Sequence, residues 1–153
     1  MKLRIFLAGV FLLVSLGCSS DREVLHDGYY SARSSDFNRD GWQEFITLYV
    51  HNNKIITVEY NARNRSGLVM SWDVRYLSRL KAVLGVNPNQ ILRGYTSELL
   101  NRQDPGLIPK AAGDTLFYET FRELSTAALA QARAGDKEVA VIPVASPAPE
   151  TRP

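Results

Sequence analysis

The feature that most constrains this chain is an amphipathic helix near its end. Over residues 116–134 one apolar stripe recurs at the helical period, and it consists of Phe117, Phe121, Leu124 and Ala128. Gly135 stands where a left-handed residue commonly ends a helix. Because such a stripe must be buried against another element, the rest of the chain is expected to supply a packed partner.

The segment before this helix, residues 108–115, ends in Gly113, Asp114 and Thr115. Asp or Thr can cap the free N–H groups of a helix start, and Gly lets the backbone approach a ligand closely. A helix N-terminus with a hydroxyl beside it also suits a phosphate or an ester-linked cofactor. Two interpretations therefore stand: a plain N-cap, which is the commoner use of such a turn, and a cofactor site.

Three strands are expected in the first half of the chain, at residues 28–34, 42–50 and 54–62. The last two form a hairpin, because Asn52 and Asn53 can supply the positive φ angles of a two-residue turn. That turn sets three cross-strand pairs, which are Phe45–Tyr60, Thr47–Val58 and Tyr49–Ile56. The opposite face carries apolar residues as well, so both faces of the sheet are expected to be at least partly covered; these residues are Leu48, Val50 and Ile55.

Two helices follow the hairpin, over residues 72–84 and from Pro88 to about Arg102. The first is expected to place one set of apolar residues on one side, namely Tyr76, Leu77, Leu80, Val83 and Leu84, and to stop at Gly85. A cap at Asn87 starts the second. Residues 138–144 add a short last strand. This order predicts an α+β fold: a small antiparallel sheet with a central hairpin packed against about three helices.

Residues 1–17 have the organisation of a secretory signal, with Lys2 and Arg4 before an apolar run too short to cross a bilayer comfortably. The only cysteine, Cys18, follows Gly17 as in a bacterial lipobox, which predicts lipid attachment there. The alternatives are an ordinary secretory signal with an incidental cysteine, or a short membrane anchor. Lipidation would hold the protein on the extracytoplasmic side of the envelope. In a Gram-negative bacterium Ser19 favours the outer membrane.

The expected domain organisation is a signal peptide at 1–17, a lipidated tether at 18–26, one domain at 27–144 and a disordered Pro-rich tail at 145–153. The sequence pI of about 8.8 overstates the charge of the mature protein. Two of the 18 basic residues lie in the signal peptide, so the remaining ones balance the 16 acidic residues. The membrane is therefore a partner through the lipid, and no nucleic-acid partner is expected.

Other chemistries find little support. The segment from Asp36 to Gly41 matches the front half of a calcium loop, but Thr47 stands where a Glu is expected, which favours a polar turn. His26 and His51 are isolated, so no metal site is predicted. No nucleophile elbow, P-loop or catalytic triad pattern occurs, so no catalytic residue is predicted and the chain is not expected to be an enzyme in its own right. Most of the dense aromatic residues should be core, while one or two could wall a flat ligand; they are Tyr29, Tyr30, Trp42, Tyr49, Tyr60 and Trp72.

Several motifs occur in one order: Asp27-Gly28-Tyr29-Tyr30, Gly41-Trp42-Gln43-Glu44-Phe45, the strand at 54–62, Ser71-Trp72-Asp73, and Tyr118 with Phe121. In this combination the chain resembles the FMN-binding-domain lipoproteins of bacteria, the major membrane immunogen type, over roughly residues 27–141. The resemblance implies FMN as cofactor, electron transfer as function, and a flavin transferase and a redox partner as interacting proteins.

The family's Asp-x-x-Ser-Gly-Ala-Thr motif is degenerate here, because Pro109, Ala112 and Asp114 replace three of its residues while Gly113 and Thr115 remain. In flavinylated relatives the motif threonine carries FMN through a phosphoester bond. The resemblance thus implies Thr115 as acceptor and Gly113 as the point of close approach, although Asp114 would repel a phosphate. The alternatives are noncovalent FMN, and a cofactor-free structural or binding lipoprotein that kept the fold.

Overall fold

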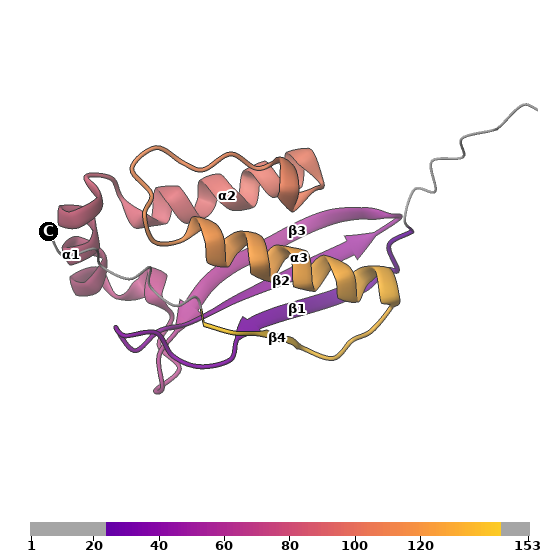
Figure 1. Ribbon diagram of the computed structural model, residues 1–153, viewed down its shortest axis with the longest axis horizontal. Coiled ribbons are helices and arrows are strands. Elements are labelled where there is room, and N and C mark those ends of the chain that lie inside the picture. Colours follow the sequence, from indigo (N-terminus) through magenta and orange to yellow (C-terminus); the bar gives the residue numbers. More distant parts are fainter. Residues whose placement is uncertain (1–23, 145–153) are drawn as a thin grey trace, which may run out of the picture.

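The computed structural model describes residues 24–144, so the expected signal peptide, Cys18 and the Pro-rich tail lie outside the described residues. Its elements are β1 (Gly28–Ser34), β2 (Gln43–His51), β3 (Lys54–Arg63), η1 (Met70–Trp72), α1 (Val74–Leu84), α2 (Pro88–Arg102), η2 (Pro105–Leu107), α3 (Tyr118–Ala134) and β4 (Ala140–Ile142). The predicted α+β class is confirmed (Figure 1). In this part of the chain no helix is both long and apolar enough to span a bilayer.

The four strands form one sheet in the order β3-β2-β1-β4. The pairs β1–β2 and β2–β3 are antiparallel, whereas β4 runs parallel to β1, with Ala32 opposite Ala140 and Ser34 opposite Ile142. The sheet is therefore mixed rather than wholly antiparallel. The reason is that α3 carries the chain back along the sheet to the end at which β1 starts, as Figure 1 shows.

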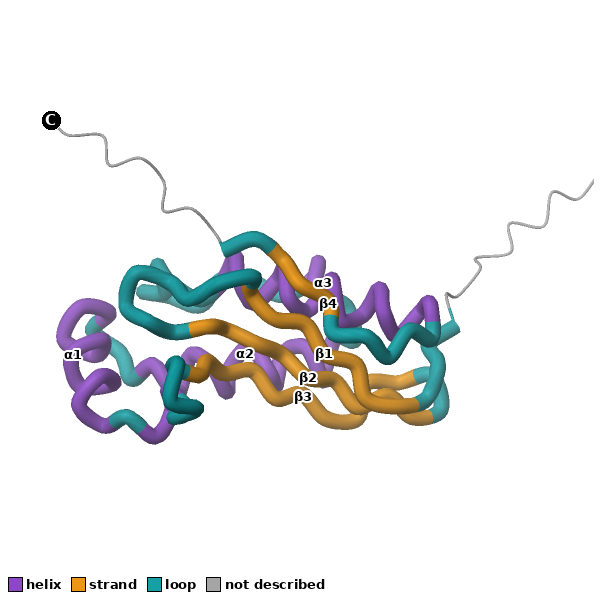
Figure 2. Tube along the Cα trace, turned by 90° about the horizontal axis from the view of Figure 1, so that it is seen from below, coloured by secondary structure: helices purple, strands orange, loops and turns teal. Residues whose placement is uncertain are grey.

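Helices α2 and α3 lie on one side of the sheet, and the other side is open (Figure 2). The core fills the space beneath the helices, with side chains from β1, β2 and α3 that include Tyr30, Ile46, Leu48 and Phe121. The expectation that both faces are covered is wrong. Every second residue of a strand points to the open face, where the side chains of β2 are partly exposed and Tyr29 of β1 is 66% exposed.

The turn of the predicted hairpin is confirmed, since Asn52 and Asn53 have φ angles of 51° and 60°. The predicted register is wrong, and none of the three predicted cross-strand pairs occurs. A bulge between Tyr49 and Val50 leaves Ile56 as an extra residue, so Ile46 rather than Phe45 lies opposite Tyr60. Because side chains alternate along a strand, this single step places Tyr60 on the covered face, where it is buried.

The helices follow the predicted pattern with two corrections. All four stripe residues of α3 are buried, and Gly85, Pro88 and Gly135 stand at the expected helix ends. However, α3 begins at Tyr118, two residues later than expected, because the side chain of Asp114 binds the preceding N–H groups. In α1, Val83 is 77% exposed rather than on the apolar side, since α1 buries only the single row Tyr76, Leu80 and Leu84.

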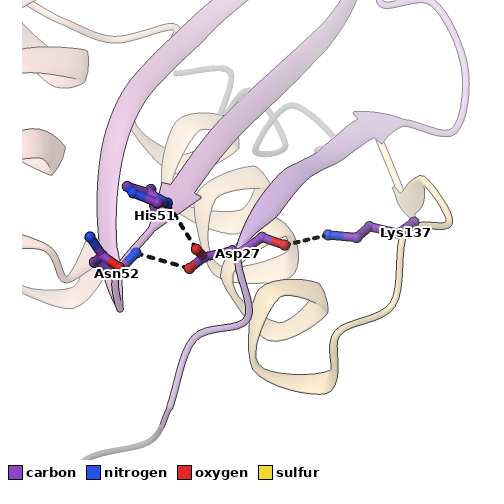
Figure 3. A network of polar contacts seen from close by, with 4 residues as sticks. All are labelled: Asp27, His51, Asn52 and Lys137. Carbon is purple, nitrogen blue, oxygen red and sulfur yellow. Dashed lines mark hydrogen bonds and ion pairs between the residues drawn. The ribbon is translucent and has the colours of Figure 1, made fainter.

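The start of β1 is fastened to two distant segments, as Figure 3 shows. The Asp27 carboxylate accepts a hydrogen bond from Asn52 N at 2.9 Å and lies 2.8 Å from His51 Nδ1. Lys137 Nζ donates to Asp27 O at 2.9 Å and to Tyr30 Oη at 2.8 Å. Gly28 has a φ angle of 140°, which disfavours any other residue, and a Cβ there would also displace Lys137 Nζ, which would lie 1.9 Å away. The first described residues are thereby held to the hairpin turn.

Candidate functional site

The structure separates the three residues before α3 into different roles. Gly113 has a φ angle of 78°, a left-handed conformation that favours glycine, and a Cβ there would lie 3.3 Å from Leu84 O. Gly113 and Thr115 are both exposed. Asp114 between them is buried, with 2% of its surface exposed. The side chain that points inward at this site is therefore Asp114, one of the three residues that depart from the motif of the FMN-binding lipoproteins.

The Asp114 carboxylate is fully engaged in what we term the Asp114 cap. Its Oδ1 accepts hydrogen bonds from Leu116 N at 2.8 Å and Phe117 N at 3.0 Å, and its Oδ2 accepts one from Tyr95 Oη at 2.5 Å. Free N–H groups at a helix start carry a partial positive charge and attract an anion. The N–H groups that Asp114 binds belong to Leu116 and Phe117, which precede the first residue of α3, and the cap residue Phe117 makes no side-chain capping bond.

Tyr95 ties the Asp114 cap to the loop before it. Its hydroxyl accepts a hydrogen bond from Ala111 N at 3.0 Å while donating to Asp114. Burial, together with the hydrogen bond to the Asp114 carboxylate, raises the pKa of Tyr95 above its ordinary value. Nearby, Tyr118 Oη donates to Ile108 O at 2.8 Å. The loop over residues 108–117 is thus fixed by tyrosines from two helices.

A second carboxyl group lies on the other side of the α3 start. Tyr60 donates a short hydrogen bond to Glu44 and lies 3.3 Å from Phe117 O. Burial raises the pKa of Glu44 to about 7, the hydrogen bond from Tyr60 opposes this shift, and the charge of Asp114 adds to it. Burial and then the charge of Glu44 raise the pKa of Tyr60 well above its ordinary value. This pair links the sheet to the loop but does not enclose Thr115.

A hollow of about 560 Å³ lies elsewhere, between the edge strand β3, η1 and α2. We call it the Trp72 groove, because the exposed indole of Trp72 forms part of its wall. Apolar side chains line part of it, among them Phe45, Val58 and Leu92, and polar ones line the rest, among them Glu59, Asn61, Ser71, Asn89, Arg93 and Thr96. Neither Gly113 nor Thr115 lines this groove.

Most polar groups of the Trp72 groove are paired with each other. Asn61 Nδ2 donates to Ser71 Oγ at 2.9 Å and to Glu59 Oε1 at 3.2 Å, while its Oδ1 accepts from Ala62 N at 3.0 Å and Ser71 N at 3.3 Å. Asn89 Nδ2 donates to Ser71 O at 3.3 Å. Residues of β3, η1 and α2 thus form one continuous polar wall.

One atom of that wall is left over. Asn89 Oδ1 is buried and has no hydrogen-bond partner, and the amide orientation is fixed because the atom that faces the Ser71 carbonyl must be a donor. Among the described residues only Ser125 Oγ shares this state, and Ser125 lies within α3 and lines neither described cavity. A buried acceptor without a donor is costly unless a partner arrives. Asn89 lines the groove, but less than 1 Å² of its Oδ1 is accessible, so a ligand N–H or O–H would reach this acceptor only after a movement of the neighbouring side chains.

The structure also places the other residues considered in the sequence, which are the calcium-loop-like segment, possible metal ligands and the aromatic residues. The segment at 36–41 is a closed turn, in which Asn38 Oδ1 accepts from Asp40 N and Trp42 N, both at 3.0 Å. In residues 24–144 no three His, Cys, Asp or Glu side chains gather in a way that could hold a metal ion. Of the six aromatic residues singled out, three are core and Tyr49 is half-buried, while Tyr29 and Trp72 are exposed.

Sequence reasoning found Trp72 as part of a family motif but missed Asn61 and Asn89. The available signals were an asparagine inside a strand, where it is uncommon, and a second asparagine just after Pro88. Neither could be assigned to a groove, because β3 and α2 meet only in the folded chain.

No family profile matches the chain. Among solved structures, a protein of Clostridium perfringens determined by crystallography superposes with a TM-score of 0.74 at 22% identity, over 79% of this chain and 99% of that protein. A protein of Clostridium thermocellum determined by NMR gives a TM-score of 0.50 at 27% identity, over 69% of this chain and 91% of the other. The first likeness shows that the fold occurs in another bacterial protein.

The sequence comparison reaches further than the fold. Over 130 residues the chain is 30% identical to the 15 kDa lipoprotein of Treponema pallidum (strain Nichols). The aligned region covers 85% of this chain and 92% of that protein. The matched region thus extends over most of both proteins. On this evidence the chain belongs to the bacterial lipoprotein family of the Treponema pallidum 15 kDa lipoprotein.

Proposed function

We propose that this protein is a lipid-anchored lipoprotein of the bacterial envelope that binds a flat, hydrogen-bonding heteroaromatic molecule, with FMN as its first candidate, noncovalently in the Trp72 groove. The observation that carries the proposal is the unpartnered, buried Asn89 Oδ1 in the wall of a hollow of about 560 Å³. A ligand of this class would supply the missing donor from the edge of its ring.

The composition of the groove fits this ligand class. The Trp72 indole is 74% exposed and offers a flat face for stacking against a ring. Arg93, on the α2 wall, provides a guanidinium for a ring carbonyl or a phosphate. Bound FMN would supply one- or two-electron transfer, and the chain would contribute stacking by Trp72, an acceptor at Asn89 and a cation at Arg93.

Covalent attachment through Thr115 fits the structure poorly. The hydroxyl of Thr115 lies on an exposed residue, which favours access by a transferase. The N–H groups that would bind the ester phosphate already bind Asp114, and the carboxylate would lie close to a second negative group. We therefore assign no step to Thr115 in the proposed function.

The second candidate function is a cofactor-free structural or binding lipoprotein, and the Asp114 cap favours it. With an internal carboxylate at the start of α3, the loop over residues 108–117 is complete without any phosphate. This candidate predicts a protein that folds, reaches the membrane and binds no flavin.

The anchor is proposed at Cys18 on the strength of its sequence context and of the relative's description as a lipoprotein. Cells that express the full chain should incorporate labelled palmitate into it, and Cys18→Ser should abolish the label. A label that persists in Cys18→Ser would assign the membrane association to another segment.

Ligand binding is tested by titrating the full chain with FMN and with riboflavin and following flavin fluorescence. Saturable quenching with about one flavin per chain is expected, and Trp72→Ala should weaken it at least about tenfold. Thr115→Ala serves as the matched control and should bind as the wild type does. An intact mass raised by one FMN and lost in Thr115→Ala would instead show covalent flavin, and no quenching by either flavin would favour the cofactor-free candidate.

A further inference from the structure

A second hollow, of about 470 Å³, lies on the open face of the sheet. We call it the arginine trough. Its floor comes from β1 and β2, with Ser31, Phe45 and Thr47, and Arg33 and Arg63 stand at its sides. The loop after β3 and Val139 bound it. It therefore lies on the face that no helix covers (Figure 2).

The charge of the trough is of one sign. Two guanidinium groups line it and no aspartate or glutamate does. Arg33 Nη1 donates to Ser34 O at 3.3 Å, and Arg63 Nη2 donates to Gln43 Oε1 at 3.5 Å, which is a long contact. Within residues 24–144 neither arginine forms an ion pair. Since each guanidinium has five N–H donors, most of them are available to a ligand.

The rest of the lining adds an apolar surface and two hydroxyls. Phe45 is half-buried between the two arginines, because it lies opposite Arg33 in the β1–β2 ladder and two residues from Gln43, the partner of Arg63. Ser31 Oγ and Thr47 Oγ1 are 2.8 Å apart and form one paired hydroxyl group. A ring would find a surface at Phe45, and its charged substituent would find the guanidinium groups.

We propose that the arginine trough binds a small organic anion, an aromatic or apolar body bearing a phosphate, with Arg33 and Arg63 on the anionic group and Phe45 beneath the body. Guanidinium groups bind phosphate through paired N–H···O bonds, which sets them apart from a simple positive charge. A volume of about 470 Å³ is within the range of small-molecule sites. The site is separate from the Trp72 groove, with which it shares Phe45 and Val69 but no charged residue.

Three probes distinguish the parts of this site when the full chain in detergent is titrated by calorimetry against a detergent blank. Phenyl phosphate should bind most tightly, inorganic phosphate more weakly because it lacks the ring, and phenol at least about tenfold more weakly than phenyl phosphate because it lacks the charge. Raising the salt concentration should weaken phenyl phosphate binding and leave the weak phenol signal unchanged.

Variants then locate the site. Arg33→Gln and Arg63→Gln should each weaken phenyl phosphate binding about tenfold. Both side chains lie on the solvent-facing side of the sheet, and far-UV circular dichroism would confirm that both variants are folded. Arg93→Gln and Trp72→Ala, in the neighbouring groove, are the matched controls and should bind phenyl phosphate within about twofold of the wild type.

Three results would overturn the assignment. The first is no phenyl phosphate binding at millimolar concentration, and the second is phenol binding as tightly as phenyl phosphate. The third is a loss of binding in Trp72→Ala but not in Arg63→Gln, which would place the anion in the Trp72 groove. Because riboflavin lacks a phosphate, its titration tests the Trp72 groove apart from the arginine trough, so failure of the trough leaves the proposed function standing, and the reverse also holds.

Discussion

The Asp114 cap and the Trp72 groove are both built around a buried polar side chain, but they differ in one respect. Both oxygens of Asp114 bind groups of the chain itself, which are two backbone N–H groups and the hydroxyl of Tyr95. In Asn89, Nδ2 donates a hydrogen bond to Ser71 O, whereas Oδ1 has no partner. The polar group of the Asp114 cap thus has its partners within the chain, whereas that of the Trp72 groove lacks one.

Whether a buried polar group has all its hydrogen-bond partners distinguishes a structural polar site from a binding site. A saturated buried group stabilises the folded state, so its loss should be measured as a loss of stability. A buried group without a partner destabilises the free protein, and a ligand that supplies the partner removes this destabilisation. Removal of such a group should therefore lower the affinity for the ligand rather than the stability of the fold. The four predictions below test this distinction, beginning with the largest change in stability.

Removal of the Asp114 side chain should have the largest effect. Asp114→Ala leaves two N–H groups at the start of α3 and the hydroxyl of Tyr95 without their partner, and should lower the free energy of unfolding by about 3–4 kcal/mol. Urea denaturation followed by circular dichroism measures it. Asp114→Asn should recover part of the loss, because the amide oxygen still accepts the N–H groups, and Thr115→Ala should cost less than about 0.5 kcal/mol. A stable Asp114→Ala would show that the cap is not structural.

Glu44 should make stability depend on pH around neutrality. Its pKa is about 7 in the folded protein against 4.5 for the unfolded chain, so between these values the folded state keeps a proton that the unfolded state has lost. The associated stability is fully present below pH 4.5 and is lost as the pH rises through 7. The free energy of unfolding should fall by about 2–3 kcal/mol over this range.

The substitution Glu44→Gln should remove that slope, since the amide does not titrate. Glu119→Gln is the control, because Glu119 is exposed and lies 3.8 Å from Arg122, and it should keep the slope of the wild type. Denaturation curves at several pH values give the comparison. A wild-type profile that is flat from pH 5 to about 8 would contradict the raised pKa of Glu44.

A side chain at position 113, in the loop before α3, should lower the stability of the fold. With φ at 78° and Leu84 O 3.3 Å from the new Cβ, Gly113→Ala should lower the free energy of unfolding by about 1 kcal/mol. Gly94→Ala, within α2 and with nothing within 4 Å of its Cβ, is the matched control and should raise stability by about 0.5–1 kcal/mol. Equal effects of both changes on the urea midpoint would refute the conformational argument.

The smallest change in stability is expected at Asn89. Asn89→Leu removes an unsatisfied oxygen and one long hydrogen bond, so stability should stay within about 0.5 kcal/mol of the wild type while flavin affinity falls. Asn61→Leu breaks four contacts in the same wall and should cost about 2 kcal/mol, which makes it the matched control. A large loss of stability in Asn89→Leu would place Asn89 with Asp114, among the structural residues.

Local signals in the sequence were sufficient for most of the fold. Helix ends at Gly85, Pro88 and Gly135 follow from caps and left-handed residues, which depend on a few neighbouring positions. The hairpin turn at Asn52-Asn53 follows from positive φ angles in the same way. The bulge at Ile56 could not be foreseen, because nothing local distinguishes Ile56 from its neighbours in a run of β-branched residues.

The candidate site was harder to predict for the same physical reason. Gly113 and Thr115 were found by motif, but the function of the residue between them depends on Tyr95, which is 19 positions away in the sequence. The Trp72 groove needs contacts between β3, η1 and α2, and the covered face of the sheet depends on the packing of α2 and α3. Long-range packing of this kind leaves only a weak trace in local composition.

The network at Asp27, His51 and Lys137 determines how an anchored molecule would face its membrane. Val24 lies only six positions after Cys18, a reach of about 20 Å if fully extended. Since the chain enters the domain at the hairpin turn, that end would lie nearest the lipid (Figures 1 and 3). Helix α1 lies at the opposite end of the sheet (Figure 1), and Trp72 directly precedes Asp73, the cap residue of α1. The groove would therefore open toward the aqueous compartment, within reach of soluble partners.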